Sequence, residues 1–171
     1  MSLVAVTAAI LMGALAIAQE ASEPIPFAKL IPFLPDKVDG FVADQADGST
    51  TAAMGFKVTT VSRTYHQGTK DSGTNVSVRI TDGTGNQFFA AAHAVVADFS
   101  HESTQGYDKG FKLDGYPAVE KYSNDDKEGA LTVFVSDRFL IEIETHGLES
   151  KALQGWWKKL DVKKLETFTP S

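Results

Sequence analysis

Strict two-residue alternation of apolar and polar side chains over residues 128–150 constrains this chain more than any other feature. The stretch is EGALTVFVSDRFLIEIETHGLES, with one alternating run on each side of Ser136-Asp137. Successive side chains of a strand point to opposite faces, so each run would place an apolar row on one face. These rows are Leu131, Val133 and Val135, then Phe139, Ile141 and Ile143. We therefore predict a tight antiparallel hairpin with a dry side and a wet side.

The wet side of this predicted hairpin gathers charged residues. The alternation places Arg138, Leu140, Glu142 and Glu144 together on the second strand. Glutamates two positions apart lie about 7 Å from each other along a strand, a separation that would suit paired-carboxylate chemistry. The sequence shows no apolar pocket beside them of the kind that makes one carboxylic acid a proton donor. We interpret the glutamates as part of a solvated face, where Arg138 partly balances their negative charge. If no helix covers this face, it is an acidic surface that could bind a basic partner.

Shorter patterns predict the other elements. Residues 75–81 alternate cleanly, and residues 55–66 have the composition of a long strand. Helical spacing occurs at 27–34, 86–99 and 148–160, strand patterns recur at 41–42 and 111–122, and polar connections are expected at 44–51 and 100–110. The order α-βββ-α-βββ-α predicts an α+β fold, with an antiparallel sheet of about six strands and helices packed on its faces. We expect one domain over residues 27–168.

This element order, with the core "GYPAVEKY…GALTVFVSDRFLIEIETHG", resembles the PsbP/Mog1-type α/β/α sandwich proteins over residues 27–166. The resemblance is one of architecture and includes no diagnostic motif, so it assigns no functional residue. It implies a non-catalytic binding or accessory role.

The N-terminal segment predicts export. The first eighteen residues, MSLVAVTAAILMGALAIA, carry no charged side chain and end in Ala16-Ile17-Ala18 before Gln19. An apolar run that ends in small-x-small is typical of a secretory signal, although a basic n-region is missing. We predict a cleaved signal peptide over residues 1–18 and an exposed leader over 19–26, with a periplasmic or extracellular location. A retained membrane anchor and a buried N-terminal helix are the alternatives.

Composition excludes several classes of site. Of 171 residues, 43% are hydrophobic and 22% charged, which is typical of a globular domain. The chain has no cysteine, which excludes disulfides, thiolate metal sites and cysteine nucleophiles. The formal net charge of −6 argues against a nucleic-acid partner, which requires a basic face.

No motif in the sequence assigns a cofactor, a metal or a catalytic residue. The four histidines, His66, His93, His101 and His146, include no helical pair at the spacing that metal ligands use. No serine has a nucleophile signature around it. A site assembled from loop residues such as His101 and His146 remains the enzymatic alternative, because catalytic groups converge in space rather than in sequence.

One basic aromatic patch stands out near the C-terminus, at Trp156-Trp157-Lys158-Lys159. Adjacent residues of a helix point about 100° apart, so we expect one tryptophan in the core and the other half-exposed. The patch is therefore a candidate contact surface, together with Arg138, Glu142 and Glu144.

These observations favour an exported, soluble, non-catalytic binding or accessory domain. Its partner would be a protein, an envelope component or a small ligand, bound at a sheet face or in a cleft beside the C-terminal helix. The alternatives are a hydrolase or transferase with a loop-assembled His/Asp site, and a membrane-tethered accessory domain that keeps its N-terminal segment.

Overall fold

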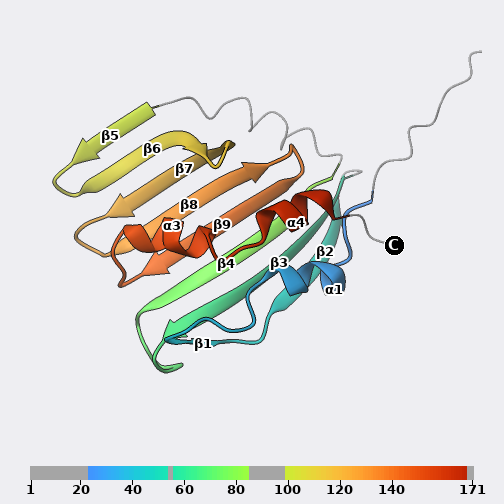
Figure 1. Cartoon of the computed structure of the whole chain (residues 1–171), viewed down its shortest axis with the longest axis horizontal. Coiled ribbons are helices and arrows are strands. Elements are labelled where there is room, and N and C mark those ends of the chain that lie inside the picture. Colours follow the sequence, from blue (N-terminus) through green and yellow to red (C-terminus); the bar gives the residue numbers. More distant parts are fainter. Residues whose placement is uncertain (1–22, 54–55, 85–98, 169–171) are drawn as a thin grey trace, which may run out of the picture.

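The computed structural model describes residues 23–53, 56–84 and 99–168, and all of its strands belong to one antiparallel sheet (Figure 1). The strands are β1 (Phe41–Ala43), β2 (Asp47–Ala53), β3 (Phe56–Gln67), β4 (Asn75–Asp82), β5 (Phe99–Ser103), β6 (Gly106–Leu113), β7 (Tyr116–Ser123), β8 (Glu128–Val135) and β9 (Phe139–His146). The described helices are α1 (Phe27–Leu30), the 3-10 turn η1 (Ile31–Phe33), α3 (Lys151–Trp157) and α4 (Val162–Thr167).

The sheet has the strand order β1-β3-β4-β9-β8-β7-β6-β5, and β2 also pairs with β3. β2 pairs with residues 56–62 of β3, while β1 pairs with residues 65–67, so the two short strands share one long neighbour. From β5 to β9 every strand pairs with the next in sequence, as expected for strands joined by short turns.

One face of the sheet is apolar and carries the described helices. We call it the dry face; it includes Val78, Leu131 and Ile141, each fully buried. Figure 1 shows α1, α3 and α4 in front of this face, and α3 contacts β8 and β9. The opposite face, the wet face, carries the alternate positions of the same strands and is exposed or half-buried. No described helix lies on it.

The alternation at residues 128–150 predicted its hairpin correctly. Leu131, Val133 and Val135 of β8, and Phe139, Ile141 and Ile143 of β9, are all at most 1% exposed. Ser136 and Asp137 form the connection, both with φ of +52°, and the backbone N–H of Arg138 donates to the carbonyl of Val135. The alternating run at 75–81 is likewise confirmed as β4, whose apolar side chains are buried.

The predicted α+β fold, with about six strands and helices on its faces in the order α-βββ-α-βββ-α, is wrong. The sheet has nine strands, and the described helices are three short ones and a 3-10 turn. The expected polar connection at 44–51 is mostly β2, and the one at 100–110 contains β5 and the start of β6. The helix expected over 86–99 lies outside the described residues, except for Phe99, which begins β5. The helix expected over 148–160 is the shorter α3, and α4 follows it.

The missed strands share a physical property. All five residues of β5 are exposed, and β2 has the composition DGSTTAA, with no large apolar side chain. A strand that buries neither face at the edge of a sheet has no need for alternating hydrophobicity. Its sequence therefore looks like that of a loop.

A buried carboxylate fastens the N-terminal segment to the sheet. Asp82, at the end of β4 and fully buried, accepts hydrogen bonds from the backbone N–H of Ile25 (2.7 Å), from Thr84 Oγ1 (2.6 Å) and from Arg138 Nε and Nη2 (3.0 and 2.8 Å). Burial by itself raises the pKa of Asp82, but these hydrogen bonds and the charge of Arg138 outweigh it and hold the pKa below its usual value. Pro24 and Ile25, at the end of the expected leader, are buried here.

We predict that Asp82→Asn lowers the free energy of unfolding by about 3 kcal/mol, because it leaves the partly buried Arg138 without its counter-charge. A carboxylate with a lowered pKa stabilises the fold above its unfolded pKa, about 4, and loses that contribution as the pH falls through the folded value. The difference between wild type and variant should thus shrink below about pH 4. Urea denaturation across pH measures both effects.

The matched control is Glu142→Gln, which removes the more exposed pair with Arg79 (3.5 Å). It should change the free energy of unfolding by less than about 1 kcal/mol. A difference for Asp82→Asn that stays constant with pH would contradict the ionic origin.

Candidate functional site

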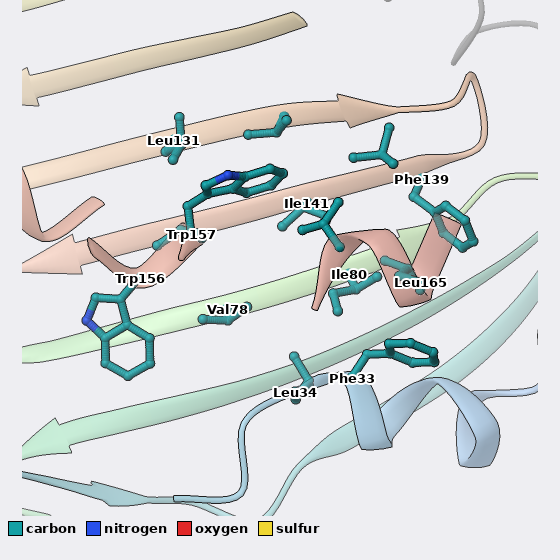
Figure 2. Close-up of a cluster of buried hydrophobic side chains, with 14 of the residues drawn as sticks. Phe33, Leu34, Val78, Ile80, Leu131, Phe139, Ile141, Trp156, Trp157 and Leu165 are labelled. Atoms are coloured by element: carbon teal, nitrogen blue, oxygen red, sulfur yellow. The ribbon is translucent and has the colours of Figure 1, made fainter. Parts of the chain in front are cut away.

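Both tryptophans of the predicted contact surface belong to the core. Trp156 and Trp157 are each 3% exposed, so the expectation that one is half-exposed was wrong. Figure 2 shows the two indoles pointing to opposite sides of α3. The ring of Trp156 lies against Phe41 and Tyr65 (5.1 and 4.6 Å between centroids), and Trp157 Nε1 donates to Asp114 Oδ2 at 2.7 Å. The side chains do diverge as helix geometry requires, but the sheet is wide enough to bury both.

The two lysines of the same patch are exposed and differ in their surroundings. Lys159 Nζ lies 6.0 Å from the centre of the Trp156 ring. Lys158 lines two hollows, one beside Asp114 and Lys163 and the other on the β6–β7 side of α3.

The charged residues of the wet side are arranged differently from the expectation. Arg138 turns away to Asp82, so it does not compensate the glutamates. Glu142 instead pairs with its cross-strand neighbour Arg79, and Glu144 lies between Ser77 and Ala130 in the register. This part of the wet face therefore has mixed charge rather than a purely acidic character.

An open groove of about 610 Å³ runs over the wet face of β5 to β9. Its charged groups are mostly paired: Lys121 with Asp108 at 3.0 Å, and His146 with Glu128 at 3.1 Å. His101 and His146 both line it but lie on β5 and β9, four strand spacings or roughly 19 Å apart. Among the described residues, no group of three histidine and carboxylate side chains could hold a metal ion.

A second hollow lies on the dry face, where the sheet extends past α3. We call it the α3 cleft; its volume is about 500 Å³. Strands β5 to β7 and the exposed stripe of α3 form its walls. It is lined by Glu102, Tyr107, Lys109, Glu120, Ser150, Lys151, Gln154, Gly155 and Lys158.

The floor of the α3 cleft is a buried carboxylate. Glu120, on β7, is only 2% exposed. Its Oε1 accepts a hydrogen bond from the Tyr107 hydroxyl at 2.5 Å and forms an ion pair with Lys109 Nζ at 3.0 Å, and its Oε2 accepts a hydrogen bond from Gln154 Nε2 at 2.9 Å. Three side chains from β6 and α3 are thus fixed around one anion. Such a group is tolerated in a core only when it is paired in this way.

The partners of Glu120 are themselves held in place. Lys109 Nζ lies over the rings of Tyr107 and Phe111, at 4.6 and 5.3 Å from their centres. Burial, followed by the hydrogen bond to Glu120, raises the pKa of Tyr107 to about 12, so its hydroxyl keeps its proton and remains a donor. Because Gln154 points its amide nitrogen at Glu120, its amide oxygen is directed elsewhere.

Sequence reasoning missed Glu120. Its neighbour Val119 is apolar, so the local pattern does not say which of the two faces inward. The usable signal is that Glu120 shares a strand face with Tyr116, Ala118 and Tyr122, all of which are buried. A glutamate in such a row is either paired or functional.

One histidine–carboxylate pair bears on the enzymatic alternative. His66 Nε2, on β3, lies 3.0 Å from Asp44 Oδ2, and Lys70 lies 3.1 Å from the other oxygen. Hydrogen bonds from His66 and then Lys70 hold the pKa of Asp44 below its usual value. Within the described chain, no serine or threonine hydroxyl is hydrogen-bonded to His66, so the pair lacks the nucleophile that a triad needs.

Comparison with protein-family models, with curated proteins and with solved structures finds no match. The resemblance to PsbP/Mog1-type proteins therefore stays a prediction. No helix in the described part of the chain has the length and apolar character to cross a membrane.

We predict that Trp156→Ala and Trp157→Ala each lower the free energy of unfolding by about 3–5 kcal/mol, because each opens a large cavity in the core. Chemical denaturation measures the loss. Trp157→Phe retains most of the apolar volume but leaves Asp114 without its indole donor, so it should cost less than the alanine variant. A near-neutral Trp156→Ala or Trp157→Ala would contradict the core assignment and restore that tryptophan as a contact residue.

Proposed function

We propose that this chain is an exported, non-catalytic domain that binds a small ligand in the α3 cleft. The observation that carries the proposal is the buried Glu120, held by two hydrogen-bond donors and one paired lysine, which provides the cleft with a rigid polar floor. Ligand sites are typically concave, of 300–1,000 Å³, with a few polar groups held in fixed positions. The α3 cleft has both properties.

The α3 cleft is favoured over the larger groove on the wet face because the cleft contains a buried charged group. The groove is built mostly from exposed and half-buried side chains, and its charges mostly pair with one another across strands. Its floor contains the small residues Gly129 and Ala130. Its lining includes the buried Thr145 and Tyr122 but no buried charged group, whereas the α3 cleft has the buried carboxylate of Glu120.

Binding is favoured over catalysis by the state of the lining groups. Both oxygens of Glu120 are engaged by donors, and no histidine is among the residues that line the cleft. A general base needs access to the proton that it removes, and a nucleophile needs a base beside it. The described lining residues supply neither arrangement.

The binding proposal predicts a stabilising ligand. A ligand at 100 times its Kd raises the free energy of unfolding by about 2.7 kcal/mol, which corresponds to roughly 5–10 °C in Tm for a domain of this size. A thermal-shift screen of the mature protein with nucleotides, sugars, organic acids, metals and lipids should find such a ligand. Glu120→Gln should reduce its shift, because Lys109 and Tyr107 lose the anion that positions them.

Glu144→Gln is the matched control, since Glu144 lies on the wet face outside the α3 cleft. It should leave the shift unchanged. A ligand whose shift disappears in Glu144→Gln but persists in Glu120→Gln would place the site in the wet-face groove and overturn the proposal.

Export is proposed from the apolar run at residues 1–18 and its Ala-Ile-Ala end. Mass spectrometry of the protein recovered from its native host should find an N-terminus at Gln19. An intact Met1 in a membrane fraction would favour the tethered alternative instead.

A further inference from the structure

The α3 cleft contains a glycine that the fold does not require. Gly155 lies inside α3, is exposed, and has no positive φ. A Cβ built on it would meet nothing within 4 Å. Glycine is a poor helix former, so a glycine here weakens α3 without relieving any contact within the described structure. A bare backbone position lets another molecule approach closely.

Two lysines flank this bare position on the same stripe of the helix. Lys151 and Lys158 both line the cleft, at four residues before and three residues after Gly155. That spacing places all three on one face of a helix. Neither lysine forms a salt bridge within the described residues, whereas Lys109 is already paired with Glu120.

The charge of the lining favours an anion. Three lysines and two glutamates line the cleft, a net charge of +1 in a chain whose total is −6. One of the glutamates, Glu120, is neutralised by Lys109 at 3.0 Å. The lining charges that form no salt bridge within the described residues are those of Lys151, Lys158 and Glu102. Lys151 also interacts electrostatically with Glu149, outside the cleft lining.

We infer that the α3 cleft binds a small organic anion, bearing a carboxylate or phosphate group, over Gly155 and between Lys151 and Lys158. The volume of about 500 Å³ suits a small molecule. Gln154 and Ser150 offer hydrogen-bonding groups for the uncharged part of such a ligand. This inference rests on the proposed function, since it assigns a ligand class to the same cleft.

Two variants test it without disturbing the core. Gly155→Leu adds a side chain that grows into the cleft from an open helical position, so the protein should fold with an unchanged or higher Tm. Lys158→Met removes one charge and keeps the aliphatic stem. Lys112→Met is the matched control, because Lys112 is an exposed residue of β6 outside the cleft lining.

Isothermal titration at constant ionic strength should use citrate, inorganic phosphate and glucose as probes. We expect citrate or phosphate to bind and glucose not to bind. Lys158→Met should weaken the anion roughly tenfold or more, as for a lost charged hydrogen bond, and added NaCl should weaken it further. Gly155→Leu should abolish binding, and Lys112→Met should retain it. Citrate alone would identify a carboxylate site, and phosphate alone a phosphate site.

The other outcomes separate this inference from the proposed function. Equal anion binding by all variants would be non-specific and would overturn the inference. If neither anion binds at millimolar concentration, the inference is overturned. The α3 cleft would still be the binding site if the thermal-shift screen finds a neutral ligand and Gly155→Leu blocks the binding of that ligand. A ligand that stabilises every variant equally would overturn both.

Discussion

The structure depends on covering one apolar face of a wide sheet with very few helical residues. Within the described chain, α1, α3 and α4 together have seventeen residues, yet the apolar dry face extends over β3, β4, β7, β8 and β9. Trp156 and Trp157 meet much of this need, because their indoles extend the buried area to both sides of α3 (Figure 2). On the β6–β7 side of α3, the dry face of the sheet is less fully covered, and a hollow is present there. This hollow is the α3 cleft, which lies over β6 and β7. No described helix lies in front of these two strands (Figure 1).

Two carboxylates are buried in the described structure, and their surroundings differ. Asp82 is enclosed by the chain itself, since its donors are Arg138, Thr84 and the backbone of Ile25. Glu120 has donors of comparable strength but lies at the bottom of an open hollow. Both are paired, as buried charges must be. What distinguishes a structural carboxylate from a candidate binding floor is therefore not its hydrogen bonding but whether solvent and ligands reach its partners.

The sequence predicted the parts of the fold in which burial is one-sided. Strands β4, β8 and β9 bury one face and expose the other, so their alternation identified both the strands and the hairpin. It failed for β2 and β5, which bury little, because an edge strand leaves no hydrophobic period. The tryptophan exposure was mispredicted because helix geometry gives directions but not the extent of the sheet that receives them. Lys158, a contact residue proposed from the sequence, lines the α3 cleft, whereas Glu120 could be noticed only from the contacts between β6, β7 and α3.

Different residues of α3, together with Lys158 that follows it, face the core and the solvent. Leu153, Trp156 and Trp157 hold the domain together, while positions 151, 155 and 158 face outward and contribute nothing to the core. Substitutions on this outward stripe therefore alter the lining of the α3 cleft without opening a cavity in the core. The same separation makes this stripe a position where the lining of the cleft can be redesigned with little effect on the stability of the fold.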